Sequence, residues 1–168
     1  MLICPTCGAE HEILDPIFRR PEAYVQLSRD SQEQHAQADD NLCRITLPEC
    51  APRYFVRGTM PVDVEGHSDG VAWGLWAEVA EDVFSRVLEL WSNPDQACEP
   101  PFDGTLANSV PTYLGTLDLK LQIQLTGPTS RPEFQFARDI THPFVQECLA
   151  GIDVHRASEW LSLVADES

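Results

Sequence analysis

Residues 116–125 alternate between polar and apolar side chains without a break, and this stretch constrains the fold more than any other. Its apolar positions are Leu117, Leu119, Leu121, Ile123 and Leu125. Successive side chains of a β-strand point to opposite faces, so this alternation predicts one buried and one solvated face. Such strands are typical of antiparallel sheets, because parallel strands are buried on both faces. We expect a strand here, a turn at 127–132 and a returning strand at 133–137.

The remaining elements follow from similar patterns. Short β-prone runs lie at 43–47, 54–58 and 71–79. Apolar side chains recur at helical spacing at 81–91, at 143–149 and after Asp153, which can cap the last helix. A short helix is expected at 21–27, and a solvated loop at 30–40. Runs of strands interrupted by helices, without regular strand–helix alternation, predict an α+β fold.

The strongest chemical motif is the pair Cys4 and Cys7, which are separated by two residues. Their thiolates can bind one Zn²⁺ when the turn between them folds back, and Gly8 permits that tight geometry. His11 can supply an imidazole. We expect a structural zinc ion here, and the alternatives are a metal-free half-knuckle or a redox dithiol.

Two or three ligands do not complete a zinc site, and the sequence holds no second Cys-x-x-Cys. The missing ligand must therefore come from elsewhere in the chain. The candidates are Cys43, Cys50, Cys98, Cys148 and a distant histidine such as His142.

The length of 168 residues and the hydrophobic content of 43% fit a single domain, 1–168. Residues 1–16 form a knuckle-like N-terminus, and residues 43–168 form the α+β body. The predicted fold is therefore one α+β domain, in which helices pack on an antiparallel sheet and an N-terminal zinc knuckle is attached.

The N-terminus lacks the basic and apolar regions of a secretory signal, and no apolar stretch reaches the ~18 residues of a membrane span. We therefore expect a cytoplasmic protein. Thiols stay reduced in that compartment, so metal binding explains some of the 6 cysteines better than disulfides do.

The chain is strongly acidic, with 11 Lys+Arg against 27 Asp+Glu and a net charge of −16. Phosphate backbones and anionic lipids are repelled by such a charge, which argues against nucleic acid and membrane surfaces as partners. A protein with a basic surface is the expected kind of partner.

Sequence motifs of catalysis are missing: the chain has no Gly-x-Ser-x-Gly, P-loop, dinucleotide fingerprint or His-Glu-x-x-His. We expect no catalytic residue, and the predicted function is that of a zinc-stabilised interaction domain. The alternative is a metal-dependent, hydrolase-like enzyme with an open zinc position near Cys4 and Cys7. A thiol redox switch through these two cysteines is the third hypothesis.

Four further side chains are expected to be structural. Arg57 should pair with one of the many carboxylates of this acidic chain. His142 begins a predicted helix and should make a structural hydrogen bond. Trp73 and Trp76 should pack in the core, although a regular strand would point one of them away from it.

The order of these landmarks resembles a bacterial family catalogued as domain of unknown function 2199. The shared motifs are Cys4, Cys7-Gly8 and His11; Cys43-Arg44-Ile45; Tyr54-Phe55-Val56-Arg57-Gly58; Trp73-Gly74-Leu75-Trp76; Thr116-Leu117-Asp118-Leu119-Lys120; and Thr141-His142-Pro143. The chain departs from the family pattern at Thr141, at Ala80 and at Phe102-Asp103-Gly104. The resemblance implies a compact bacterial domain. It favours His11 and Cys43 as companions of the two knuckle cysteines and His142 as a reserve ligand, so the expected metal set is Cys4, Cys7, His11 and Cys43.

Overall fold

The computed structural model describes residues 2–165, and a seven-stranded sheet forms its centre. The strands are β3 (Ala36–Ala38), β4 (Leu42–Ile45), β5 (Arg53–Val64), β6 (His67–Val79), β7 (Phe102–Leu106), β8 (Lys120–Gln124) and β9 (Glu133–Phe136). They lie side by side in chain order, and each neighbouring pair in that order is antiparallel. The α+β class and the hairpin of β8 and β9 are therefore confirmed.

The sheet differs from the predicted simple antiparallel sheet because its edge closes. β5 also pairs with β9, in parallel, through Thr59 and Glu133. The strands β5 to β9 therefore form a five-stranded barrel, and β3 and β4 extend it beyond β5. The long β5 and β6 strands allow this closure, since twist accumulates along them and brings the last strand back to the first.

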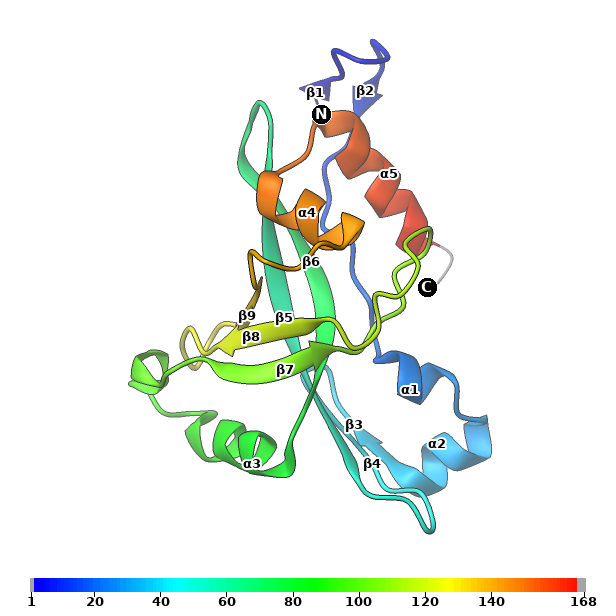
Figure 1. Cartoon of the computed structure of the whole chain (residues 1–168), viewed down its shortest axis with the longest axis vertical. Helices are drawn as coiled ribbons and strands as arrows, with labels where there is room; N and C mark the ends of the chain where they lie inside the picture. The colour runs from blue at the N-terminus through cyan, green and yellow to red at the C-terminus, as the bar shows by residue number, and fades with distance from the viewer. Residues whose placement is uncertain (1, 166–168) are drawn as a thin grey trace.

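Helices flank the long β5–β6 hairpin (Figure 1). They are α1 (Glu22–Val25), α2 (Arg29–His35), α3 (Glu81–Leu90), the 3-10 helix η1 (Gln96–Cys98), α4 (Pro143–Ala150) and α5 (Val154–Val164). α4 and α5 lie at one end beside the small hairpin of β1 (Leu2–Ile3) and β2 (Glu10–His11), whereas α2, β3 and β4 lie at the other end. No helix within residues 2–165 has the length and apolarity to span a membrane.

Aromatic side chains fix α4 and α5 against the barrel. The ring of Trp73, on β6, lies 5.5 Å from that of Phe144 on α4 and 5.2 Å from that of Trp160 on α5, measured between centroids. All three side chains are fully buried, as is Trp76. Core packing of Trp73 and Trp76 is therefore confirmed, and the position of α5 is set by a large apolar contact.

Two predicted elements need correction. The alternating stretch forms a strand only over Lys120–Gln124, because Asp118 adopts a left-handed φ of 67° that ends the pleat, and Leu117 is 41% exposed. The predicted loop at 30–40 instead contains α2 and β3. Ser28 starts α2 by accepting a hydrogen bond from the backbone N–H of Ser31.

Candidate metal centre

The first eleven residues fold as a tight knuckle. The strands β1 and β2 pair antiparallel, and the turn between them is closed by two backbone hydrogen bonds of 2.8 Å: Gly8 N–H donates to the carbonyl of Cys4, and Cys4 N–H donates to that of Ala9. Gly8 has a φ of 71°, a conformation that costs other residues free energy. This turn brings Cys4 and Cys7 to the same side of the hairpin.

Four cysteine and histidine side chains, which are residue types that can bind a metal ion, meet at this turn. Cys4, Cys7, His11 and His155 each place one ligand atom so that all four atoms lie within 4.8 Å of one another. The Sγ of Cys7 and the Nε2 of His11 are already 3.1 Å apart. Donor atoms of a tetrahedral zinc site are roughly 3.3–3.8 Å apart, given Zn–S and Zn–N distances of about 2.3 and 2.0 Å. The group is therefore close to the size that one zinc ion requires.

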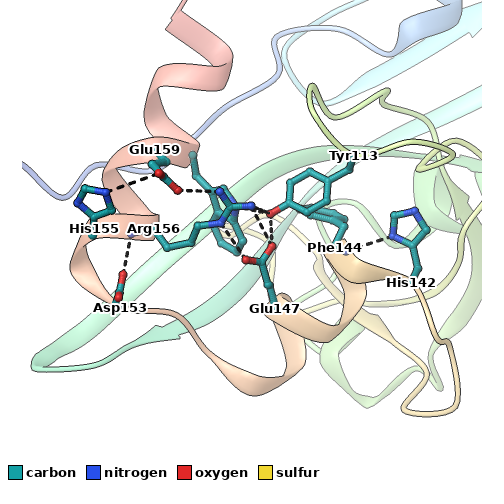
Figure 2. Close-up of polar contacts among 9 residues, drawn as sticks. Tyr113, His142, Phe144, Glu147, Asp153, His155, Arg156 and Glu159 are labelled. Carbon is teal, nitrogen blue, oxygen red and sulfur yellow. Dashed lines mark hydrogen bonds and ion pairs between the residues drawn. The ribbon is translucent and has the colours of Figure 1, made fainter. Parts of the chain in front are cut away.

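His155 reaches the knuckle from the first turn of α5. Asp153 caps this helix by accepting a hydrogen bond of 2.7 Å from the backbone N–H of Arg156. The Nδ1 atom of His155 is buried and has no hydrogen-bond partner among residues 2–165, while its Nε2 lies 3.6 Å from a carboxylate oxygen of Glu159 (Figure 2). A metal-bound histidine commonly uses one ring nitrogen for the metal and the other for a carboxylate. The donor set and this unpartnered nitrogen fit a bound metal ion.

The knuckle also favours the thiolate form of Cys4. Burial raises the pKa of this thiol, but hydrogen bonds from the backbone and side chains of Cys7 and Thr6 outweigh burial and lower the pKa to about 6. Thiolates are the form that binds metal. Cys4 is therefore prepared to act as a ligand near neutral pH.

A polar network holds α5 in place beside the group formed by the two cysteines and two histidines. Arg156 donates hydrogen bonds to Glu147 on α4, at 2.8 Å, and to the hydroxyl of Tyr113, at 2.5 Å (Figure 2). The same hydroxyl donates to Glu147 and accepts a 2.8 Å hydrogen bond from Nε1 of Trp160. Burial, followed by the hydrogen bond to Glu147, raises the pKa of Tyr113 to about 12. The network joins α4, α5 and the β7–β8 connection.

The fourth predicted ligand, Cys43, does not belong to this group. Its side chain is 1% exposed and lies in the main hydrophobic core, on β4. Figure 1 places β4 at the opposite end of the molecule from β1 and β2. Burial in this apolar environment raises the pKa of the Cys43 thiol to about 12, which favours an inert protonated thiol. The structure therefore brings Cys4, Cys7 and His11 of the predicted set together, leaves Cys43 apart from them, and adds His155 to the group.

The other candidates also lie outside the group. His142 starts α4: its Nδ1 accepts a hydrogen bond from Phe144 N–H at 3.1 Å, and its Nε2 lies 2.7 Å from the carbonyl of Leu114. The structural role expected for His142 is therefore confirmed, because its side chain caps α4. Cys148 is buried in α4, where burial raises its pKa, and the remaining two cysteines, Cys50 and Cys98, are exposed.

The sequence does not indicate His155 as a ligand, because this residue lies far from the knuckle along the chain. Local spacing indicates ligands that share a turn, such as Cys4, Cys7 and His11, but carries no information on contacts between chain ends. The available signal was weak: Asp153 predicts a helix start, and a histidine follows it in the first turn.

A known family model matches most of the chain. The model of the family described as "Uncharacterized protein conserved in bacteria (DUF2199)" matches residues 3–152. The matched region contains Cys4, Cys7 and His11 and ends before His155. No curated protein and no solved structure matches the chain significantly.

Proposed function

The chain belongs to this bacterial family, and we propose that it is a zinc-stabilised interaction domain in which Cys4, Cys7, His11 and His155 bind one structural zinc ion. One observation carries the proposal. Side chains from the N-terminal knuckle and from the last helix converge within 4.8 Å, and His155 contributes a buried nitrogen without a partner among the described residues.

Zinc is favoured over other metals by the donor set. Two thiolates and two imidazoles form a Cys₂His₂ set, which is typical of tetrahedral zinc. Ca²⁺ and Mg²⁺ prefer oxygen ligands, which this group lacks.

A structural role is favoured over a catalytic one by the ligand count. A catalytic zinc has three protein ligands and keeps a fourth position for water, whereas this group offers four side-chain donors. The ion would join the β1–β2 hairpin to α5, two segments from opposite ends of the sequence. The metal-dependent enzyme with an open position is therefore the weaker of the two hypotheses.

The partner is proposed from charge. The net charge of −16 favours a cytoplasmic protein with a basic surface as the binding partner, and it disfavours nucleic acids and anionic membranes as partners. Native co-purification at low and at high salt tests this part. We expect a basic protein that is retained at low salt and released at high salt, and the proposal fails if no protein is retained under either condition.

The zinc content of the purified, untagged chain and its variants tests the site. We expect about one zinc per chain in the wild type, on the ligand count. Cys4→Ser and His155→Ala should lose the metal, whereas Cys43→Ser and the exposed-cysteine control Cys50→Ser should keep it. Equal zinc content in wild type and His155→Ala would show that the four-ligand assignment is wrong.

A further inference from the structure

Three arginines from distant parts of the sequence converge on the turn at 39–41. Arg20 donates to the carbonyl of Asp39 at 3.0 Å, and Arg57 donates to the carbonyl of Asp40 at 3.1 Å. Arg131 donates to the side-chain oxygen of Asn41 at 3.0 Å. Three successive residues of one turn therefore each accept a hydrogen bond from a different arginine.

These guanidiniums form no ion pair with a carboxylate of residues 2–165, although the chain has 27 Asp+Glu against 11 Lys+Arg. The expectation that Arg57 pairs with a carboxylate is thus wrong. The carboxylate of Asp39 is already engaged, because it accepts 2.7 Å hydrogen bonds from the backbone N–H groups of Asn41 and Leu42. On such an acidic chain, a cluster of arginines without carboxylate partners requires an explanation.

Arg57 is the most unusual member of this group. Its side chain is 7% exposed, and its Nε is buried without a hydrogen-bond partner in the described part of the chain. Its guanidinium lies 5.9 Å from the ring centroid of Trp76, its register partner on β6. A buried charge is costly unless it is paired, so the site is electrostatically incomplete.

The surroundings of Arg57 are cationic. Burial lowers its pKa most, and the neighbouring charges of Arg131, Arg20 and Arg19 lower it further, while Asp40 alone acts in the opposite direction. The local charge is thus positive within a molecule of net charge −16.

We propose that Arg20, Arg57 and Arg131 form a binding site for the phosphate group of a small soluble ligand. The Nη1 atom of Arg57 donates to the turn, whereas its buried Nε has no hydrogen-bond partner among the described residues. An oxyanion bound at the edge formed by Nε and Nη2 would supply that missing partner through two parallel hydrogen bonds. Arg20 and Arg131 add charge for a dianion.

Small ligands are favoured over polymers by the same charge distribution. The overall negative charge repels polyanions over long range, whereas a single phosphate group experiences mainly the local arginines. This site is separate from the zinc proposal: it lies around β5 and the β3–β4 turn, whereas the knuckle of β1 and β2 lies beside α5 at one end of the molecule (Figure 1).

Isothermal titration calorimetry of the full-length protein with inorganic phosphate tests this proposal. Chloride at matched ionic strength controls for screening, malonate provides a dianion of different shape, and a single-stranded oligonucleotide represents a polyanion. We expect saturable binding of phosphate, weaker binding of malonate, and no binding of the oligonucleotide at physiological salt.

Variants locate the binding site. Arg131→Gln replaces an exposed side chain and should fold; it should weaken phosphate binding about tenfold, equivalent to about 1.4 kcal/mol. Arg57→Lys keeps the charge but removes the bidentate edge, and should weaken binding at least as much. Arg138→Gln, a matched exposed arginine with no hydrogen bond to the turn among the described residues, should bind like the wild type.

Three results would overturn the proposal. The first is a phosphate response no larger than that of matched chloride, and the second is equal weakening by Arg131→Gln and Arg138→Gln. Tighter binding of malonate or of the oligonucleotide than of phosphate would assign the cluster to another class of ligand.

Discussion

Closure of the barrel between β5 and β9 predicts that Gly58→Ala is destabilising. Gly58 lies on β5, and a Cβ added to it would lie 2.3, 2.6 and 2.7 Å from Cε1, Cζ and Cδ1 of Phe134 on β9. The Phe134 ring is 0% exposed and cannot move into solvent. The new methyl group would therefore displace a packed aromatic ring inside the barrel.

The size of this effect follows from two opposing contributions. Ordinary carbon contacts are about 3.5–4.0 Å, so the ring must move by roughly 1 Å. Overpacking of this kind costs about 1–3 kcal/mol, and replacing glycine restricts the unfolded chain, which returns about 0.4–1 kcal/mol. A contact as short as 2.3 Å places the cost near the upper end of its range. We therefore expect a net loss of about 2 kcal/mol in the free energy of unfolding, or roughly 4–8 °C in Tm for a chain of this size.

Urea unfolding followed by circular dichroism measures the loss. Gly74→Ala is the matched control on β6, because its Cβ would meet the exposed side chain of Ile17 at 3.1 Å, and that side chain can move. It should change the stability by less than about 1 kcal/mol. Gly58→Ala should also cost less in a Phe134→Leu background. A Gly58→Ala variant as stable as the wild type would refute the packing of Phe134 against β5.

Two further predictions concern buried polar groups. Tyr113→Phe should lower the free energy of unfolding by about 1–3 kcal/mol, because the buried Nε1 of Trp160 loses its acceptor; urea unfolding that is unchanged would contradict the network. Burial raises the pKa of the Cys43 thiol from 9.0 to about 12, so this thiol ionises at lower pH in the unfolded chain than in the folded protein. The contribution of Cys43 to the free energy of unfolding is therefore fully present below pH 9 and is lost as the pH rises toward 12. Cys43→Val should reduce this alkaline loss relative to the wild type, and Cys50→Ser should not; identical pH profiles for all three proteins would contradict this reasoning.

The sequence predicts those parts of the fold that depend on local pattern. The spacing of Cys4 and Cys7 followed by Gly8 indicates a tight turn, and this turn forms. The helix that follows Asp153 is confirmed as α5, because capping and apolar spacing are local properties.

Long-range contacts could not be predicted in this way. The pairing of β9 with β5 depends on accumulated strand twist, which a pattern of alternating side chains does not record. The alternation of polar and apolar side chains also includes Leu117 in the sequence, although the left-handed backbone of Asp118 separates Leu117 from the strand. The presence of His155 beside the knuckle, where Cys43 is expected, also depends on a long-range contact. The packing of Trp160 on Trp73 sets the position of α5, which carries His155.

X-ray absorption at the zinc edge tests the proposed metal centre most directly. For the wild type it should detect two sulfur ligands at about 2.3 Å and two imidazole nitrogens at about 2.0 Å. His155→Ala should lose the metal and with it the zinc-edge signal, and Cys43→Ser should give an unchanged spectrum. Three sulfur ligands in the wild type, or a spectrum that changes in Cys43→Ser but not in His155→Ala, would contradict the assignment.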